Sequence, residues 1–175
     1  MNSVEIEGLQ LQLRTARTVC DGSVRVPNRA GVYFIAVELT SPLLRLGQSG
    51  HYTVRVTGSE FAIIYVGETW AVKNRLLEHL VGDWKVSNFR HSVLALQQSL
   101  SSDSQSDSEE SLSKQLLRDA VVGFCEPDFV GPAERALINA LQPAFNIRGC
   151  HDAAWKRELQ KVRKIFSAGQ PLERE

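Results

Sequence analysis

Gly31-Val32-Tyr33 and Tyr65-Val66-Gly67 decide the fold, because each triplet sets a tyrosine on an apolar run. The first triplet begins residues 31–39, which are rich in β-branched and aromatic side chains, and the second ends the apolar run 61–67. Runs of this composition predict β-strands, and a strand that is apolar throughout is typically buried on both faces. Each triplet alone is ordinary in a β-sheet, so the pattern around the two must carry any further conclusion.

Helical and turn patterns predict the elements on either side of the triplets. Thr69 can cap a helix in which Val72, Leu76 and Leu80 form an inward stripe at helical spacing. By the same reasoning we expect an extended segment at 4–13, helices at 69–81, 89–100 and 153–167, a third strand at 120–125, and a helix that starts at Gly131-Pro132 and ends before Pro143.

The charges are balanced in total but not along the chain. The 20 basic and 20 acidic residues give a net charge of zero, which argues mildly against nucleic-acid binding. Residues 99–113, however, hold four acids and no lysine or arginine. Without these four acids, 20 bases face 16 acids, a net charge of +4, and residues 148–164 hold six bases against two acids. We expect the Ser-rich acidic segment to be a flexible loop, because it has little apolar area to offset its ordering entropy.

The cysteines and the amino terminus indicate the compartment. Cys20, Cys125 and Cys150 are odd in number and lack CxxC spacing, which gives no zinc or disulfide framework and suits a reducing cytosol. Residues 4–7 are acidic and alternating, unlike a signal peptide, and no apolar run approaches membrane-spanning length. We therefore expect a single cytoplasmic domain over residues 1–175 with no membrane partner.

Downstream of the two tyrosines, four polar residues follow in order: Arg75, His79, Glu134 and Asn146. Together the six positions resemble the catalytic core of the GIY-YIG nucleases. The resemblance covers about residues 30–148 and implies an α/β (α+β) fold, a small central sheet of three antiparallel strands flanked by helices. Two insertions interrupt it, a hairpin-like arm at about 40–60 and the acidic loop at about 99–113. A histidine one turn beyond the arginine is similar to a subgroup that includes some restriction enzymes.

The resemblance implies a role for each side chain in phosphodiester hydrolysis. Tyr33 would be the base or its relay, and Tyr65 would position water or the phosphate. Arg75 offers a planar fork of donors that suits a phosphate. His79 emerges on the same helix face and could accept the proton of Tyr33. A divalent ion and the arginine would favour the phenolate, since a tyrosine whose pKa stays near ~10 is a poor base.

The same resemblance makes Glu134 the one protein carboxylate that holds a Mg²⁺ (or Mn²⁺) ion, with waters and a substrate oxygen completing the octahedron. Asn146 would help to order the site. Taken singly, each has an ordinary explanation, since a carboxylate near a helix start suits the helix dipole and asparagine often caps or turns a chain. The order and spacing of all six favour the nuclease interpretation.

Basic residues outside this constellation are candidates for binding DNA phosphates. Arg45 and Arg55 lie in the predicted arm, which we expect to contact DNA as insertions do in restriction-type relatives. The helix at 153–167 has an apolar stripe on one face and basic residues on the other. This pattern suits a helix that follows the phosphates of DNA, but it also suits an ordinary amphipathic surface helix. The predicted DNA-binding residues are Arg45, Arg55, Arg90, Arg148, Lys156, Lys161 and Lys164.

We predict a Mg²⁺-dependent DNA endonuclease of a restriction, defence or mobile-element kind. One site per chain cuts one strand, so cutting both would need a homodimer or two successive encounters. Two alternatives stay open: a catalytically weakened or inactive DNA-binding module of the same fold, and a structure-specific repair or recombination nuclease. Glu68 motivates the first, because many family members carry lysine there. It either points away, adds a metal contact or weakens activity.

Overall fold

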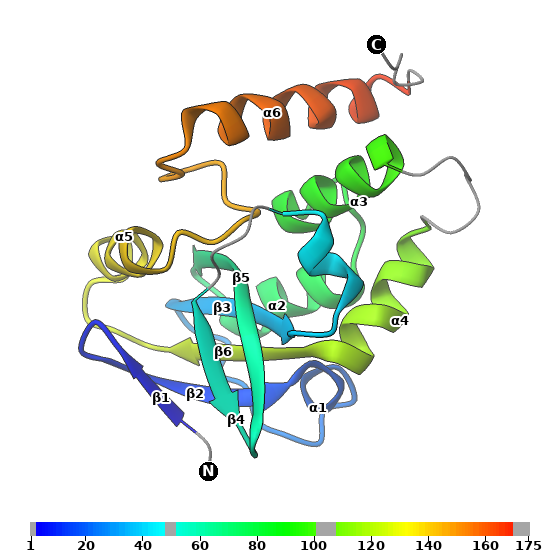
Figure 1. The fold of residues 1–175 in the computed structure, drawn as a ribbon. Helices are drawn as coiled ribbons and strands as arrows, with labels where there is room; N and C mark the ends of the chain where they lie inside the picture. Colours follow the sequence, from blue (N-terminus) through cyan, green and yellow to red (C-terminus); the bar gives the residue numbers. More distant parts are fainter. Residues whose placement is uncertain (1–2, 48–51, 101–107, 170–175) are drawn as a thin grey trace.

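The structure is a computed structural model that describes residues 3–47, 52–100 and 108–169 (Figure 1). In these parts of the chain, six antiparallel strands form one sheet in the order β1-β2-β6-β3-β5-β4. The three central strands are those predicted from the sequence, and the antiparallel sheet flanked by helices confirms the expected α+β fold. The strands are β1 (Ser3–Ile6), β2 (Leu9–Thr15), β3 (Gly31–Glu38), β4 (Thr53–Val56), β5 (Ser59–Thr69) and β6 (Ala120–Cys125).

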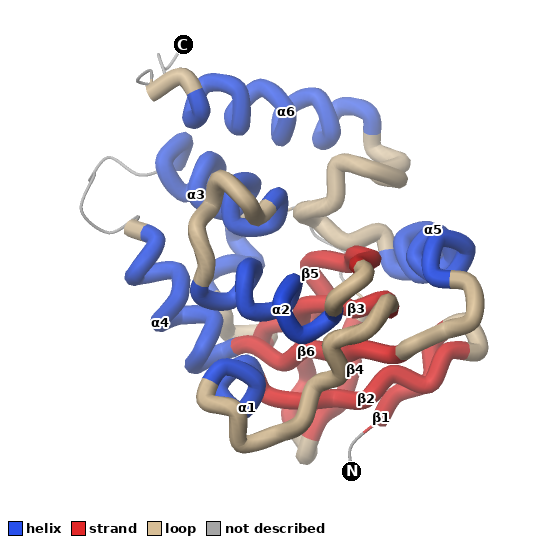
Figure 2. Tube along the Cα trace, turned by 180° about the vertical axis from the view of Figure 1, so that it is seen from behind, coloured by secondary structure: helices blue, strands red, loops and turns tan. Residues whose placement is uncertain are grey.

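Helices cover both faces of the sheet (Figure 2). Apolar residues of α1 to α4 and of α6 join one hydrophobic cluster, and those of α5 join a second cluster on the opposite face. The helices are α1 (Ala16–Cys20), α2 (Val72–Val81), α3 (Asn88–Leu100), α4 (Glu109–Asp119), α5 (Val130–Leu141) and α6 (Ala153–Ser167), with a 3₁₀ turn η1 at Pro42–Arg45. None of the helices in the described part of the chain is both long and apolar enough to cross a membrane.

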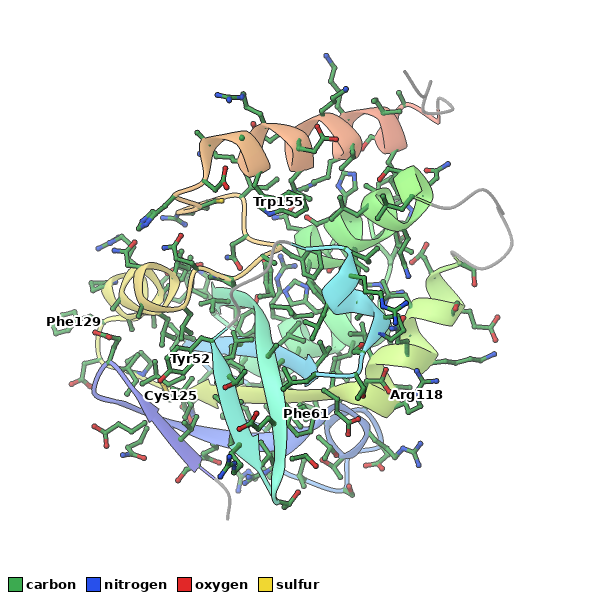
Figure 3. All side chains as sticks on the ribbon, viewed as in Figure 1. Tyr52, Phe61, Arg118, Cys125, Phe129 and Trp155 are labelled. Atoms are coloured by element: carbon green, nitrogen blue, oxygen red, sulfur yellow. The ribbon has the colours of Figure 1, made fainter. Side chains whose placement is uncertain are left out.

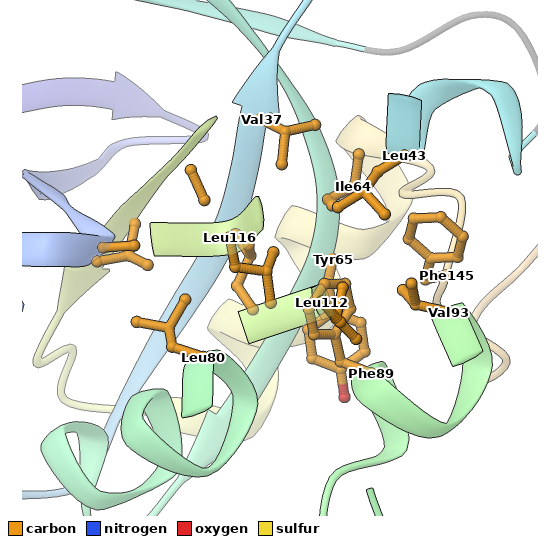
Figure 4. Close-up of a cluster of buried hydrophobic side chains, with 14 of the residues drawn as sticks. Val37, Leu43, Ile64, Tyr65, Leu80, Phe89, Val93, Leu112, Leu116 and Phe145 are labelled. Carbon is orange, nitrogen blue, oxygen red and sulfur yellow. The ribbon is translucent and has the colours of Figure 1, made fainter. Parts of the chain in front are cut away.

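The central strand β3 is apolar throughout because both of its faces are covered. Tyr33 and Ile35 belong to the cluster under α1 to α4, and Val32 and Phe34 alternate with them into the cluster under α5. Figure 4 shows part of the first cluster, where residues of α3 and α4 close over the strands. This packing fixes the strands that carry the two tyrosines.

The extended segment expected at 4–13 is divided by a turn into two strands that form a hairpin. The chain reverses at Glu7-Gly8, where both residues have positive φ (51° and 74°). Glycine adopts such a conformation without steric cost, and two positive φ values suit a tight hairpin. β2 then pairs with β6 and widens the sheet beyond three strands.

The predicted arm at 40–60 extends the same sheet. β4 pairs with β5 through the tight turn Thr57-Gly58, so this part of the insertion is an edge strand. Arg55 faces Glu60 across the hairpin, and the two exposed side chains form an ion pair of 2.9 Å. Residues 48–51, at the centre of the predicted arm, lie outside the described residues.

The acidic segment is shorter than the loop predicted at 99–113. α3 continues to Leu100, and α4 begins at Glu109 with the Ser108 side chain accepting the Ser111 amide hydrogen. Leu112 and Leu116 of α4 are buried, so this part of the segment has enough apolar area to order. Loop was therefore the wrong prediction from Glu109 onward, and residues 101–107 lie outside the described part of the chain.

Two helix starts differ from the predictions. α2 is preceded by Ala71 and not by Thr69, whose hydroxyl accepts the Ala71 amide hydrogen instead. α5 begins at Val130, so Glu134 lies in the second turn of the helix. The helix dipole acts mainly within the first turn, which weakens the structural explanation for this carboxylate.

Candidate active site

Five of the six predicted catalytic side chains line one open cavity of about 560 Å³. They come from separate elements: Tyr33 from β3, Tyr65 from β5, Arg75 from α2, Glu134 from α5 and Asn146 from the loop after α5. The sixth, the α2 residue His79, is fully buried and reaches the cavity through its bond to Tyr33. The fold therefore brings together residues that are up to 113 positions apart (33 to 146).

β3 and β5 place the two tyrosines on the same face of the sheet. Tyr33 pairs with Gly67 and Ile35 pairs with Tyr65, so the tyrosines lie diagonally, with ring centroids 6.4 Å apart. Glycine is required at 67, because a Cβ there would overlap the hydroxyl of Tyr33. Directly beyond Ile35 the register shifts and leaves Ile64 without a partner on β3, a bulge of the kind that re-aims side chains beside active sites.

Asn146 orders the strand that carries Tyr65. β4 pairs with β5 as far as Ala62, and the loop after α5 takes over the free edge beyond it. The Phe145 amide donates to the Ile64 carbonyl at 3.0 Å. The Asn146 Oδ1 accepts the Val66 amide hydrogen at 2.9 Å, and its Nδ2 donates to the Val66 carbonyl at 2.7 Å. One side chain thus satisfies both backbone groups of the residue next to Tyr65.

A buried chain of hydrogen bonds lies behind Tyr33. Its hydroxyl is 2.7 Å from His79 Nε2, and His79 Nδ1 is 2.6 Å from the Ser87 hydroxyl. The Ser87 oxygen accepts the Arg90 amide hydrogen at 3.1 Å, so its own proton can point to Nδ1. In that tautomer Nε2 carries the hydrogen and donates to Tyr33. The chain then runs from a backbone amide to the phenol oxygen.

Burial governs the pKa values of these groups. It raises the pKa of Tyr33 well above the ordinary value, an effect that Tyr65 reinforces and Arg75 opposes. It raises the pKa of Tyr65 as well, again against Arg75. Burial, together with the charges of Arg75 and Arg90, lowers the pKa of His79 well below the ordinary value. A neutral, weakly basic His79 suits donation to Tyr33 better than the predicted acceptance of its proton.

Arg75 stands at the mouth of the cavity beside the two phenols. Its Nη1 donates to Glu78 Oε2 at 2.6 Å and to the Val86 carbonyl at 2.7 Å, which anchors one branch of the guanidinium. The pKa of this arginine is raised by the Glu78 hydrogen bond and by the two tyrosines, against the effect of burial, which lowers it. The guanidinium is therefore held as a fixed positive charge.

Glu134 carries an unsatisfied oxygen into the same cavity. The residue is 6% exposed, and its Oε2 is buried without a hydrogen-bond partner in the described residues. Arg148 Nη1 lies 3.6 Å from this oxygen. Burial and the nearby Glu68 raise the pKa of Glu134, while Arg148 and the Glu68 backbone oppose the rise. A buried carboxylate oxygen with an ion pair but no hydrogen bond has room for a further partner, either a cation or a donor from solvent or substrate.

A divalent cation fits this oxygen. No group of three or more His, Cys, Asp or Glu side chains that could hold a metal occurs among residues 3–47, 52–100 and 108–169. Such an ion would therefore rest on Glu134, with waters and substrate oxygens as further ligands, in the manner of Mg²⁺. Glu68, the residue that departs from the common lysine, also lines the cavity and lies 3.4 Å from Arg148. It does not point away from the site.

Basic side chains, called the basic rim below, also line the cavity. Arg148 and Lys156, which were predicted to bind DNA, line the cavity, and so does Arg163. Arg163 was missed, although its place seven residues beyond Lys156 puts both on one helix face. Its Nη2 donates to Asn88 Oδ1 at 2.8 Å, and its Nε donates to His91 Nδ1 at 3.2 Å.

These bonds fasten α6 to α3. At the other end of α6, Trp155 points toward the body of the molecule, and its indole donates to the Ala144 carbonyl at 2.7 Å (Figure 3). The basic helix is therefore held over the cavity by bonds at both ends.

The remaining predicted DNA-binding residues lie elsewhere. Lys161 and Lys164 are exposed on α6, and neither they nor Arg45 and Arg55 line the cavity. The prediction for Arg90 is wrong, because this side chain is fully buried. Its guanidinium donates to the carbonyls of Leu80 and Glu109 and to Ser113, so it ties α2 to α4.

The comparison with known families agrees with this geometry. The profile of the GIY-YIG catalytic domain matches residues 31–165, a span that contains all six of the predicted catalytic residues. The chain therefore belongs to the GIY-YIG family, a family of nucleases. No curated protein and no solved structure was matched.

Proposed function

We propose that this chain is a DNA endonuclease that depends on Mg²⁺ or Mn²⁺ and hydrolyses one phosphodiester bond per site. The observation that carries the proposal is Oε2 of Glu134, a buried oxygen that pairs with Arg148 at 3.6 Å but has no hydrogen-bond partner among the described residues. Its side chain lines the same cavity as Tyr33, Tyr65 and Arg75. A carboxylate for a cation, a fixed guanidinium and two phenols can supply the charge stabilisation and the base that hydrolysis of a phosphate diester needs.

The side chains divide the work by position. Arg75 and the basic rim hold the phosphate, and Tyr65 orients it or the attacking water. Tyr33, as the phenolate, accepts the proton of that water while the water oxygen bonds to phosphorus and the bond to the leaving sugar oxygen breaks. The leaving oxygen takes a proton from solvent. A cation on Glu134, when bound, supplies positive charge that stabilises the phosphate and lowers the pKa of the phenol.

His79 and Ser87 support the base from behind. A hydrogen bond from Nε2 stabilises the phenolate form of Tyr33, which burial alone disfavours. Ser87 holds the ring nitrogen on the other side. This division makes Tyr33 the catalytic base, with His79 and Ser87 as positioning residues.

Nicking of supercoiled plasmid tests the proposal. We expect the wild type to convert plasmid to open circles with Mg²⁺ or Mn²⁺ and to stop when EDTA is added. Glu134→Gln should lose the activity, whereas Glu60→Gln, on β5 and outside the cavity, should keep it. Nicking that persists in Glu134→Gln contradicts the metal role, and DNA binding without any cutting by the wild type supports the inactive module instead.

A further inference from the structure

A second groove, of about 900 Å³, adjoins the candidate active site. It lies between the start of α2 and the start of α5, and it shares Glu68 and Arg75 with the catalytic cavity. The two spaces therefore meet at the position where the phosphate is proposed to bind. Whatever enters the groove is in reach of a strand held in the cavity.

Two aromatic side chains stand out on this groove. Trp70 is 88% exposed and Phe129 is 75% exposed, the largest values for large apolar residues in the described parts of the chain. Neither belongs to the two hydrophobic clusters, so the fold gains little from them. Figure 3 shows Phe129 at the edge of the molecule, on the chain entering α5.

The backbone under Trp70 is held firmly. The amides of Val72 and Lys73, which follow it, donate to the carbonyls of Arg29 and Pro27 at 3.0 and 3.1 Å. The exposed indole therefore sits on a fixed support, a property that an aromatic binding platform needs.

The charges of the groove argue against a phosphate as its occupant. Glu68, Glu78 and Asp128 line it, with Arg75 as the cation among its described lining residues. Acidic side chains repel a backbone phosphate but accept hydrogen bonds from the amino groups of bases. An uncharged flat ring with donors on its edge fits both the aromatic and the acidic walls.

We propose that this groove receives an unpaired nucleobase of the strand being cut, stacked on Trp70 or Phe129. The inference rests on the proposed nuclease function, because the adjoining cavity must hold the phosphate of that strand. Bases stack on exposed aromatic side chains without regard to sequence. The enzyme would then prefer DNA with an unpaired nucleotide beside the cut, as the structure-specific alternative requires.

Binding measured without cleavage tests this site. Glu134→Gln serves as the parent, and oligonucleotide duplexes with or without one unpaired 2-aminopurine report both affinity and stacking. We expect Trp70→Ala or Phe129→Ala to weaken binding of the unpaired substrate by roughly 5- to 150-fold, the range of one stacking contact. The paired duplex should be affected little, and Trp70→Phe should restore binding.

Tyr52→Ala is the matched control, since Tyr52 is 46% exposed and lies outside the groove. Equal loss for paired and unpaired DNA, or no loss, overturns the inference. If the groove instead binds a protein segment, 2-aminopurine fluorescence should not change when the protein is added. That result also overturns the inference. If the unpaired base binds as expected but plasmid is never nicked, the nuclease proposal fails and the binding site stands.

Discussion

The hydroxyl of Tyr33 lies 2.7 Å from Nε2 of His79, and both side chains are buried. Forty-six positions separate the two residues in the chain. An isolated phenol in this place would be a poor base, since burial raises its pKa. The hydrogen bond gives the phenol oxygen a neutral donor on the side away from the cavity, so that its open side can face water and phosphate.

Ser87→Ala should lower the cleavage rate by about 10- to 100-fold with little change in KM, because Ser87 acts on Tyr33 through His79. The substitution also leaves His79 Nδ1 and the Arg90 amide without a partner, at a cost of about 1–3 kcal/mol in unfolding free energy. Single-turnover rates and urea unfolding measure the two effects.

Ser92→Ala separates the catalytic effect from a structural one. Ser92 is buried on α3 and donates to the Asn88 carbonyl, but no bond joins it to His79. It should lose stability without losing cleavage, and Ser87→Thr should recover activity. Equal rates for Ser87→Ala and Ser92→Ala would contradict the positioning role.

The pH dependence of stability should reveal His79. In the folded protein the pKa of His79 is well below 6.5. The neutral imidazole therefore contributes fully to the unfolding free energy above pH 6.5. This contribution is lost as pH falls, because His79 binds a proton in the unfolded chain but not in the folded chain. The slope for one such group is about 1.4 kcal/mol per pH unit. Urea unfolding between pH 7.5 and 5.5 should show a smaller slope for His79→Gln. The pKa of His91 is lowered too, mainly by burial, so His91 affects stability with the same sign and His91→Gln is the comparison variant. An unchanged slope in His79→Gln would refute a neutral buried imidazole.

Glu134→Gln should raise thermal stability in the absence of metal. The pKa of Glu134 in the folded protein is raised above 4.5. The protonated carboxyl therefore contributes fully to the unfolding free energy below pH 4.5, and this contribution is lost as pH rises through the folded pKa. At neutral pH the ionised, buried carboxylate therefore costs stability. Mn²⁺ should raise the melting temperature of the wild type. At a hundredfold excess over its Kd, the ion should add about 2.7 kcal/mol to the free energy of unfolding. An equal Mn²⁺ shift in Glu134→Gln would show that the ion binds elsewhere.

Asn146→Ala should destabilise the fold by about 1–3 kcal/mol, because the Val66 amide and carbonyl lose their partners at the edge of β5. Cleavage should fall too, since Tyr65 is the preceding residue. Asn139→Ala, at an exposed position on α5, should change neither quantity. Wild-type stability for Asn146→Ala would mean that water replaces the side chain and that it does not order the strand.

Lys156→Ala should weaken DNA binding and reduce the salt slope by about one unit, the effect of losing one phosphate contact. Arg55→Ala should change neither, because Arg55 pairs with Glu60 and lies outside the cavity. Fluorescence anisotropy across a range of salt concentrations measures both variants. If Arg55→Ala changed DNA affinity and the salt slope more than Lys156→Ala, the result would support the predicted DNA-binding arm and contradict a role for the basic rim.

The three central strands could be predicted from the sequence because local patterns specify them, whereas the six catalytic residues were predicted from the family resemblance. The glycines of the two triplets are visible in the sequence because packing requires them. A Cβ at Gly67 would overlap the Tyr33 hydroxyl, and a Cβ at Gly31 would overlap the Cys125 carbonyl. The last helix was predicted at its observed bounds, because its apolar stripe has a strict helical period.

Features that depend on tertiary contacts were beyond the sequence. Arg90 has the composition of a surface cation, yet its guanidinium donates in the interior to the carbonyls of Leu80, near the end of α2, and Glu109, at the start of α4. Ser87 became visible as a site residue only when the fold brought it to His79. The start of α4 was hidden by serine-rich composition, although Ser108 and the following acids form a typical helix start.

The single-turnover rate of Tyr33→Phe tests the account most directly. At saturating protein, with Mg²⁺ and an end-labelled DNA that the wild type cuts, this variant keeps the ring and loses only the oxygen. We predict that cleavage falls by at least about 100-fold, the usual contribution of a general base, while DNA affinity changes little. Cleavage at the wild-type rate would contradict the assignment of Tyr33 as the base.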